Sequence, residues 1–344
     1  MIRYITVDST ITGVGKYAYD LYNLMQDRSS IMQIIFNKKY LDPYYKNPVM
    51  GTKYPALNYA FTGIVYNKTI NSLENSTDII HITSQTIKPF FKKRGTIITI
   101  HDAIAFKDEY NPKTFIDKIK QFYLKRYTME YVKYDNIITV SNYVKNNLIE
   151  LLNADENKIS VIYPYISDDF FNIEDKTNLS RELNLPENKK LVLSISSDSP
   201  RKNLKMVSDI MGRLGEDFAL VRVGSRIGNS FEFMNINNAI LNKLYNACDV
   251  LLFPTLEEGF GYPVAEAFKT GIPVVSSDIP VIRETANNSA VLANPESLDE
   301  NIEGIYKAIE NKNYYIKKGM DTSEIYTGKN IRKKLDDYYN DMME

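Results

Sequence analysis

Two carboxylates and two cations stand in turns of this chain where they could do chemistry together. Glu258 and Glu266 lie eight positions apart, with the glycine-rich turn GFGY at 259–262 between them. Arg201 and Lys202 follow a proline in a second turn. Guanidinium and ammonium groups suit phosphate, and carboxylates suit the hydroxyl groups of a sugar or ribose. The four side chains therefore predict a site that binds a phosphate and a sugar.

The elements that must position the two carboxylates are a strand, a turn and a short helix. An apolar run of strand length covers 249–253, and a helix is expected over 264–269 with Gly271 as its stop. Pro263 suits the first helical position, because its missing N–H costs nothing there. The free N–H groups of this helix start predict an anion site, with Glu266 in the first helical turn.

The two histidines occupy different places on predicted strands. His101 follows the strand over 96–100, and ligands of open α/β sheets bind beyond the carboxyl ends of strands. Asp102 either orients this imidazole or caps the next segment. His81 lies inside the strand over 78–83 and is interpreted as a hydrogen-bonded structural residue. Two histidines leave no room for a histidine-rich metal cluster.

The stretch EGFGYPVAEAFKTGIPVV at 258–275 resembles the E-x7-E signature of retaining family 4 glycosyltransferases. The glycine loop GVGKY at 13–17, the pair HD at 101–102 and PRKNL at 200–204 are similar to further motifs of that family. The resemblance spans nearly the whole chain. It implies an α/β chain of the GT-B fold, with two doubly wound Rossmann-like domains facing a cleft.

The implied domain organisation has three parts. We expect an acceptor-side Rossmann-like domain over 1–167 and a Rossmann-like domain for the nucleotide-sugar donor over 168–325. A terminal helix over 326–344 is expected to pack back on the first domain. A length of 344 residues suits two domains, and each half has its own strand–helix turns.

The resemblance implies a role for each candidate residue. The expected catalytic residues are His101, Arg201, Lys202 and Glu258. His101 and Glu258 contact the transferred sugar, and the two cations hold the donor's diphosphate. Glu266 accepts hydrogen bonds from the ribose hydroxyls. The expected donor-binding residues are Gly13, Gly15, Gly224, Gly259, Phe260, Gly261, Tyr262 and Glu266. The sequence departs from the family at Ser196-Ser197, where relatives have Gly-Arg or Gly-Thr.

These roles predict a retaining glycosyltransferase that moves a hexose, mannose or glucose, from a nucleoside-diphosphate sugar to a hydroxyl of a glycan, lipid or other acceptor. Fixed cations and a helix N-terminus can stabilise the departing diphosphate, so no metal and no cofactor are expected. Two alternatives remain open. One is a sugar-nucleotide epimerase of the same fold, and the other is a non-catalytic nucleotide-sugar-binding protein.

A nicotinamide cofactor is a less favoured interpretation. The pattern Gly13-x-Gly15-x-x-Ala18 matches a dinucleotide fingerprint. That fingerprint requires an acidic residue at the end of the second strand, and here the strand runs into 37–39, which is NKK.

Composition and charge bound the compartment and the partners. The chain is 44% hydrophobic and 25% charged, as in globular proteins, and no apolar run reaches the ~20 residues of a membrane span. The single cysteine, Cys248, is expected to be a buried inert thiol and fits a reducing, cytoplasmic compartment. No nucleic-acid partner is expected.

Positive charge gathers in the first half of the chain. The first 165 residues carry 21 Lys and Arg against 15 Asp and Glu, and the rest carry 21 against 28. This favours an anionic acceptor or peripheral contact with the inner face of a membrane, or it is ordinary variation in surface composition. The aromatic, basic helix expected over 115–134 either lies on anionic lipid or is an ordinary surface helix.

Overall fold

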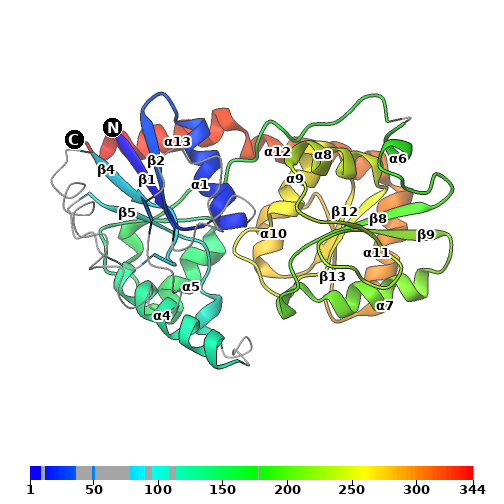
Figure 1. Ribbon diagram of the computed structural model, residues 1–344, viewed down its shortest axis with the longest axis horizontal. Coiled ribbons are helices and arrows are strands. Elements are labelled where there is room, and N and C mark those ends of the chain that lie inside the picture. The colour runs from blue at the N-terminus through cyan, green and yellow to red at the C-terminus, as the bar shows by residue number, and fades with distance from the viewer. Residues whose placement is uncertain are drawn as a thin grey trace. The chain divides into compact units, whose positions relative to one another are not determined.

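The structure is a computed structural model that describes residues 1–8, 12–35, 49–50, 78–87, 89, 95–107, 114–176 and 178–343. The chain divides into two compact units, coloured blue to green with a red end and green to orange in Figure 1. Unit 1 comprises Met1–Tyr165 and Ile331–Glu344, and unit 2 comprises Ile166–Asn330. Residues 37–39, on which the argument against NAD rests, lie outside the described ranges.

Unit 1 is built on a parallel sheet with the strand order β3-β2-β1-β4-β5-β6-β7. Its central strands are buried along almost their whole length, because helices cover both faces of the sheet. The strands are β1 (Ile2–Thr6), β2 (Ser29–Ile35), β3 (Val49–Met50), β4 (Ile79–Ile82), β5 (Ile97–Ile100), β6 (Asn136–Thr139) and β7 (Ile159–Val161).

Three helices of unit 1, α1, α4 and α5, begin at hydroxyl caps. The side chains of Thr12, Thr114 and Ser141 each accept a hydrogen bond from a backbone N–H of the first turn. The helical segments are α1 (Gly13–Leu24), η2 (Ile104–Phe106), α4 (Phe115–Tyr131), α5 (Asn142–Leu152), η4 (Glu156–Lys158) and α13 (Gly328–Asp341).

Helix α13 brings the end of the chain into unit 1. Ile331, Leu335 and Tyr339 recur every four residues and are buried, so one stripe of the helix faces the core. Arg332 donates a hydrogen bond to Leu24 O at 2.7 Å, which satisfies a carbonyl in the last turn of α1. Arg28 adds an ion pair to Asp336 at 3.0 Å. These contacts join α13 to the C-terminal end of α1 and to the turn that follows it.

Unit 2 is built on a parallel sheet with the strand order β10-β9-β8-β11-β12-β13. Helices cover both of its faces, with α8 and α9 on one and α7 and α11 on the other (Figure 1). The strands are β8 (Lys190–Ile195), β9 (Phe218–Val223), β10 (Phe231–Phe233), β11 (Val250–Phe253), β12 (Val274–Ser277) and β13 (Val291–Ala293). The helical segments are α6 (Leu179–Glu182), η5 (Pro200–Lys202), α7 (Leu204–Leu214), α8 (Asn238–Ala247), α9 (Tyr262–Thr270), α10 (Pro280–Ala286), α11 (Leu298–Glu310), α12 (Lys312–Ser323) and η6 (Glu324–Tyr326).

The order of the strands in unit 2 reverses between β8 and β11. From β8 the chain builds outward through β9 and β10, and then it returns to β11 on the other side. Loops that leave the two strands at such a point diverge, and they form the crevice in which open α/β sheets bind ligands. The expected doubly wound α/β architecture is confirmed in both units, and it locates the candidate site of unit 2.

Candidate active site

The loops that follow β8 and β11 are tied together where the strand order reverses. The first leads into the short helix η5, which ends with Arg201 and Lys202. The second runs from Pro254 to Gly261. The backbone N–H of Leu256 donates to Arg201 O at 2.7 Å. Two turns that are more than fifty residues apart in the sequence therefore form one surface.

Arg201, Lys202 and Glu258 form a cation–carboxylate cluster on this surface. Arg201 Nη1 donates to Glu258 Oε2 at 2.8 Å and to Glu257 O at 2.8 Å. Lys202 Nζ donates to the other carboxylate oxygen, Glu258 Oε1. The Thr255 hydroxyl, which the sequence did not indicate, lies 3.0 Å from the same oxygen. Both cations are thus held by one carboxylate.

The charges of the cluster are largely removed from water. The side chains of Glu258, Lys202 and Arg201 are 9%, 11% and 25% exposed. Burial raises the pKa of the Glu258 carboxyl, but the positive charges of Lys202 and Arg201 outweigh burial, and the pKa lies below its ordinary value. The carboxylate stays ionised, so the three side chains carry a net charge of about +1. Such a cluster suits an anion.

Helix α9 begins beside the cluster, two residues earlier than expected. Gly261 caps it with a φ of 97°, and a Cβ there would lie 2.9 Å from the Ile282 side chain, so glycine is required. Tyr262 is the first helical residue and Pro263 the second. The predicted position of Glu266 in the first turn was wrong. It is the fifth residue of the helix and lies in the second turn, because the helix starts directly after Gly261.

The Glu266 side chain of α9 is buried and accepts a hydrogen bond from a side chain of α8. The Tyr245 hydroxyl donates to Glu266 Oε2 at 2.7 Å and lies 3.3 Å from Pro263 O. Burial raises the pKa of Tyr245 well above its ordinary value, and the nearby carboxylate raises it further, so the hydroxyl keeps its proton. In the sequence, Tyr245 lies in a helical segment over 238–247 that resembles a motif of family 4 glycosyltransferases, but no role was predicted for this side chain. Its contact with Glu266 joins positions twenty-one residues apart.

Between Glu258 and Glu266, the Phe260 side chain packs into the core, whereas the glycines present only their backbone. The Phe260 ring is buried, with its centroid 5.5 Å from that of Tyr262 and 5.3 Å from that of Tyr326. Its carbonyl accepts a hydrogen bond from the Thr285 hydroxyl at 2.5 Å. Gly259 and Gly261 add no side chain to the surface. Phe260 therefore anchors the turn, and a ligand would meet mainly backbone here.

Gly224 lies at the end of β9 against the loop that follows β8. Its φ is 130°, and a Cβ would lie 2.3 Å from Ser196 O, so only glycine fits. Beside it, the fully buried Arg222 donates to Val223 O and Ser196 O, both at 2.6 Å, and to Ser194 O at 3.2 Å. Arg222 was not predicted from the sequence, although an arginine within the apolar strand FALVRV is itself a signal. It joins the ends of β8 and β9 beneath Ser196.

In unit 1, Gly13 and Gly15 are the first and third residues of α1, and the Gly15 N–H donates to Thr12 Oγ1 at 3.0 Å. His101 follows β5 and is buried. Its Nε2 lies 2.7 Å from Thr83 O, and since a carbonyl only accepts, this nitrogen carries a proton. Burial lowers the pKa of His101, against smaller opposing effects of the Thr83 carbonyl and of Asp102. The neutral ring then has Nδ1 as its hydrogen-bond acceptor.

Three further predictions about single residues can be compared with the structure. The Asp102 carboxylate accepts a hydrogen bond from Ile104 N at 3.1 Å, so it caps the segment η2. His81 is fully buried and both of its ring nitrogens have hydrogen-bond partners, as expected of a structural histidine. Cys248 is a free, buried thiol, and burial raises its pKa well above the ordinary value. These three residues lie outside the candidate site of unit 2.

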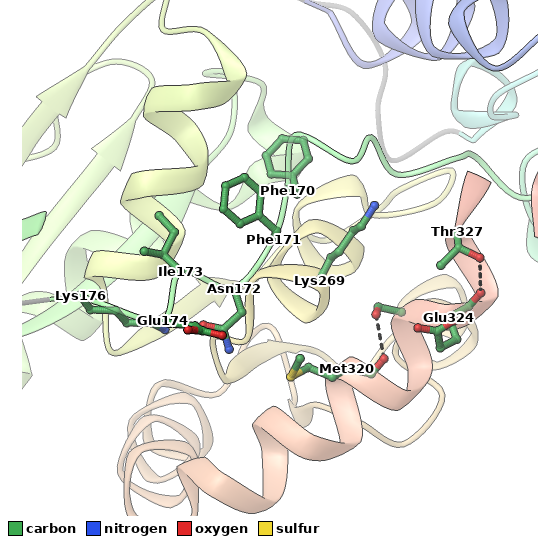
Figure 2. Close-up of a pocket in the computed structure, with 11 residues that line it drawn as sticks. Phe170, Phe171, Asn172, Ile173, Glu174, Lys176, Lys269, Met320, Glu324 and Thr327 are labelled. Atoms are coloured by element: carbon green, nitrogen blue, oxygen red, sulfur yellow. Dashed lines mark hydrogen bonds between the residues drawn. The ribbon is translucent and has the colours of Figure 1, made fainter. Parts of the chain in front are cut away.

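A groove of about 800 Å³ opens elsewhere in unit 2. Figure 2 shows that Phe170, Phe171 and Lys269 line it together with Met320 and Glu324 of α12 and η6. Lys269 belongs to the last turn of α9, whereas the cation–carboxylate cluster lies at its start. None of the residues predicted for the site lines this groove, so it is distinct from the candidate site.

Among the described residues, no three His, Cys, Asp or Glu side chains come together in a group that could hold a metal ion. In the same ranges, no helix has both the length and the apolar character that crossing a bilayer requires.

Two family models match consecutive parts of the chain. Residues 11–170 match Glycosyltransferase Family 4, and residues 175–322 match Glycosyl transferases group 1. With two doubly wound units and these turns, the chain is a glycosyltransferase of the GT-B fold. It belongs to glycosyltransferase family 4.

Curated relatives and solved structures agree with this assignment. The chain is 27% identical to the O-antigen chain mannosyltransferase RfbU of Salmonella typhimurium over 89% of this chain and 91% of that protein. It is 23% identical to O-antigen chain mannosyltransferase B of Escherichia coli over 84% of each. The fold is similar to that of Anabaena HepE, solved with UDP and glucose, with a TM-score of 0.79, 16% identity and coverage of 99% and 100%. The fold is also similar to that of WaaG, a glycosyltransferase involved in lipopolysaccharide biosynthesis. The TM-score is 0.75 and the identity is 15%, over 98% of this chain and 99% of that chain.

Proposed function

We propose that this glycosyltransferase transfers a hexose, mannose or glucose, from a nucleoside-diphosphate sugar to a glycan or lipid-linked hydroxyl with retention of the anomeric configuration and without a metal ion. The observation that carries the proposal is the cation–carboxylate cluster of Arg201, Lys202 and Glu258 beside the start of α9. The cluster has a net positive charge and lies where open α/β sheets bind ligands.

The chemistry places its greatest demand on the leaving group. The bond from the anomeric carbon to the diphosphate breaks with its electron pair going to the phosphate oxygen, and the acceptor hydroxyl forms the new bond. The acceptor's proton passes to the departing diphosphate, so the step balances. Arg201, Lys202 and the N–H groups at the start of α9 would stabilise the charge that develops on the diphosphate. This positive charge supports a reaction that needs no metal.

The two carboxylates would take different parts of the donor. Glu266 is held by Tyr245, and we propose that it accepts hydrogen bonds from the ribose hydroxyls. Glu258 is already committed to both cations, so its first role is to hold them in place for the diphosphate. Contact between Glu258 and the transferred sugar is a second role. In unit 1, Nδ1 of His101 would accept a hydrogen bond from a sugar hydroxyl.

The relatives support a choice of donors to test first. RfbU and mannosyltransferase B are named as mannosyltransferases, and HepE was solved with UDP-glucose as well as with UDP and glucose. We therefore propose GDP-mannose and UDP-glucose as the first donors to try. The O-antigen relatives favour a glycan acceptor carried on a lipid.

Helix α4 is the proposed site of peripheral contact with the inner face of a membrane. Phe115 and Phe122 are 77% and 61% exposed, and the exposed Lys118 and Lys120 lie beside them. Aromatic and basic side chains on one exposed helix suit the surface of an anionic bilayer. The full chain should float with vesicles containing phosphatidylglycerol, and Phe115→Ser/Phe122→Ser should not. Retention of binding by that variant, or equal loss in the exposed-residue control Phe171→Ser, would overturn the contact.

The function is tested by pairing donor binding with product analysis. Thermal unfolding is measured with a panel of nucleoside diphosphates and their sugars, because a ligand that binds the folded state raises its apparent stability. The stabilising donor is then incubated with a lipid-linked glycan, and the anomeric proton of the product is assigned by NMR. Retention with EDTA present is expected. An inverted product, or turnover that EDTA abolishes, would contradict the proposal.

The same samples separate the other candidate functions. A sugar-nucleotide epimerase would change the donor's sugar in the absence of any acceptor. A protein that only binds nucleotide sugars would be stabilised by a donor and yield no product with any acceptor.

A further inference from the structure

A continuous chain of buried polar side chains crosses unit 1, and we name it the tyrosine–histidine chain. The Tyr4 hydroxyl lies 3.2 Å from the Tyr339 hydroxyl, which lies 2.7 Å from His81 Nδ1. On the other side of the ring, His81 Nε2 lies 2.7 Å from Thr99 Oγ1. Thr99 Oγ1 in turn lies 3.1 Å from the Tyr17 hydroxyl. All five side chains are fully or almost fully buried.

The members of this chain must donate and accept as a unit. Burial lowers the pKa of His81 to about 3, and the neighbouring His101 lowers it too, so the ring is neutral at pH 7. A neutral imidazole donates at one nitrogen and accepts at the other, and each hydroxyl has one proton to donate. The tautomer of His81 therefore sets the direction of the hydrogen bonds on both of its sides.

One end of the chain contacts His101. The Tyr17 ring packs edge-on against the imidazole, with the centroids 4.8 Å apart and an interplanar angle of 89°. The His101 ring is also held by the hydrogen bond from its Nε2 to Thr83 O. Tyr17 also lies two residues after Gly15 in α1, so it joins the glycine loop to His101. A shift of Tyr17 would move both.

The other end of the tyrosine–histidine chain lies in helix α13. Tyr339 is the third buried residue of the α13 stripe, and the guanidinium of Arg28 lies 6.0 Å from its ring centroid. An apolar side chain of the same size would fill this space without the cost of removing polar groups from water. A fully satisfied polar network instead gives the core a single arrangement.

We propose that Tyr339 and His81 are positioning residues for His101, which they hold through Thr99 and Tyr17. Helix α13 thereby sets the orientation of His101, which follows β5. The proposal deepens the proposed function, because it rests on the role given there to His101.

Kinetics of conservative variants test the proposal first. Tyr339→Phe keeps the ring and removes one hydroxyl, and kcat should fall by roughly tenfold while the donor Kd stays within about twofold. His81→Asn offers one donor and one acceptor on a neutral group, so it should retain more activity than His81→Phe. Tyr131→Phe is the matched control. It removes a buried hydroxyl of unit 1 that donates to Ile87 O and lies outside the chain, and kcat should not change.

A double-mutant cycle separates positioning from general destabilisation. If Tyr339 acts through His101, Tyr339→Phe should change kcat by less than about twofold in a His101→Ala background. Independent losses that multiply in the double variant would overturn the proposal. Parallel losses of kcat and melting temperature in Tyr339→Phe and Tyr131→Phe would overturn it as well.

A readout that needs no turnover keeps this test apart from that of the proposed function. The sequence has two histidines, so selective ¹⁵N-histidine labelling reports both rings in one spectrum. Tyr339→Phe should shift the ring nitrogen signals of His81 and also those of His101, and Tyr131→Phe should shift neither. Unchanged His101 signals in Tyr339→Phe would overturn the proposal even in an active enzyme. Shifted signals in a protein without transferase activity would instead contradict the proposed function alone.

Discussion

The cation–carboxylate cluster of unit 2 and the tyrosine–histidine chain of unit 1 solve two different problems with buried polar groups. The cluster sets two positive charges against one carboxylate and keeps a net positive charge. The chain consists of groups that are neutral at pH 7 and are satisfied by one another. Charge is thus concentrated where a diphosphate would be bound, and it is absent where a histidine has only to be oriented.

This difference shows which property of each region a substitution should alter. Removing a member of the cluster changes the charge available to the leaving group, so the rate of transfer should fall steeply. Removing a member of the chain changes geometry, and the effect should be smaller and should depend on His101. The four experiments that follow either break this contrast or sharpen it.

Loss of Lys202 should have the most severe effect. In Lys202→Ala, we expect kcat to fall by about 100-fold or more, because a preorganised charge at the leaving group is lost. Steady-state kinetics with the preferred donor measure the change. The control is Lys205→Ala, since Lys205 is 86% exposed and pairs only along its own helix with Asp209 in the described contacts. A fall of less than threefold in Lys202→Ala would remove the charge argument.

Loss of Glu266 should act on binding instead of turnover. Hydrogen bonds to a charged group contribute about 1.5–3 kcal/mol, so Glu266→Ala should weaken donor binding by about 10- to 100-fold. The value of kcat at saturating donor should change by less than about threefold. Calorimetric titration measures the affinity, and Glu303→Ala, at an exposed glutamate of α11, is the control. A loss confined to kcat would exchange the proposed roles of the two carboxylates.

Because His81 of the tyrosine–histidine chain is neutral in the folded protein, the stability of the protein should depend on pH. The pKa of His81 is about 3 in the folded protein and about 6.5 in the unfolded chain, so the unfolded state takes up the proton first as the pH falls. The free energy of unfolding should fall by about 2 kcal/mol through His81 between pH 7 and pH 5. Urea unfolding of wild type and His81→Asn measures the difference. Equal losses in the two proteins over this range would show that His81 is not held neutral.

Loss of the hydrogen bond from Tyr245 to Glu266 should have the smallest effect. Tyr245→Phe removes one hydrogen bond to a buried carboxylate, so donor affinity should fall by about three- to tenfold. In a Glu266→Ala background the same change should have almost no effect, because the tyrosine then has no carboxylate to hold. Calorimetry on the four proteins of this cycle provides the test. Additive losses would separate Tyr245 from Glu266.

The sequence predicted the charged region better than the neutral one. Arg201 and Lys202 are adjacent, and Glu258 and Glu266 flank one turn, so short motifs contain them. The start of α9 was misplaced by two residues, because the left-handed backbone of Gly261 begins the helix at once. Arg222 lies in no motif, and the motif-like segment that contains Tyr245 gave this side chain no role, so only their contacts across the sheet and between helices identify them.

The tyrosine–histidine chain could not be read from spacing. Tyr4 and Tyr339 are 335 positions apart, and their hydroxyls meet only because α13 packs back into unit 1. The sequence predicted a strand around His81 and a terminal helix, which are the elements that carry His81 and Tyr339. Which buried polar groups satisfy one another is decided by tertiary packing, and no local pattern records it.

We propose above that the cation–carboxylate cluster binds the donor's diphosphate, and this binding can be measured directly. Removing both cations alone would leave the Glu258 carboxylate buried and unpaired, so the test variant is Arg201→Met/Lys202→Met/Glu258→Gln, with Glu258→Gln alone as the control. Calorimetric titration with GDP and with UDP should show binding of at least one to wild type, and binding at least about 100-fold weaker to the triple variant. Equal affinity in wild type and in a folded triple variant would contradict the account.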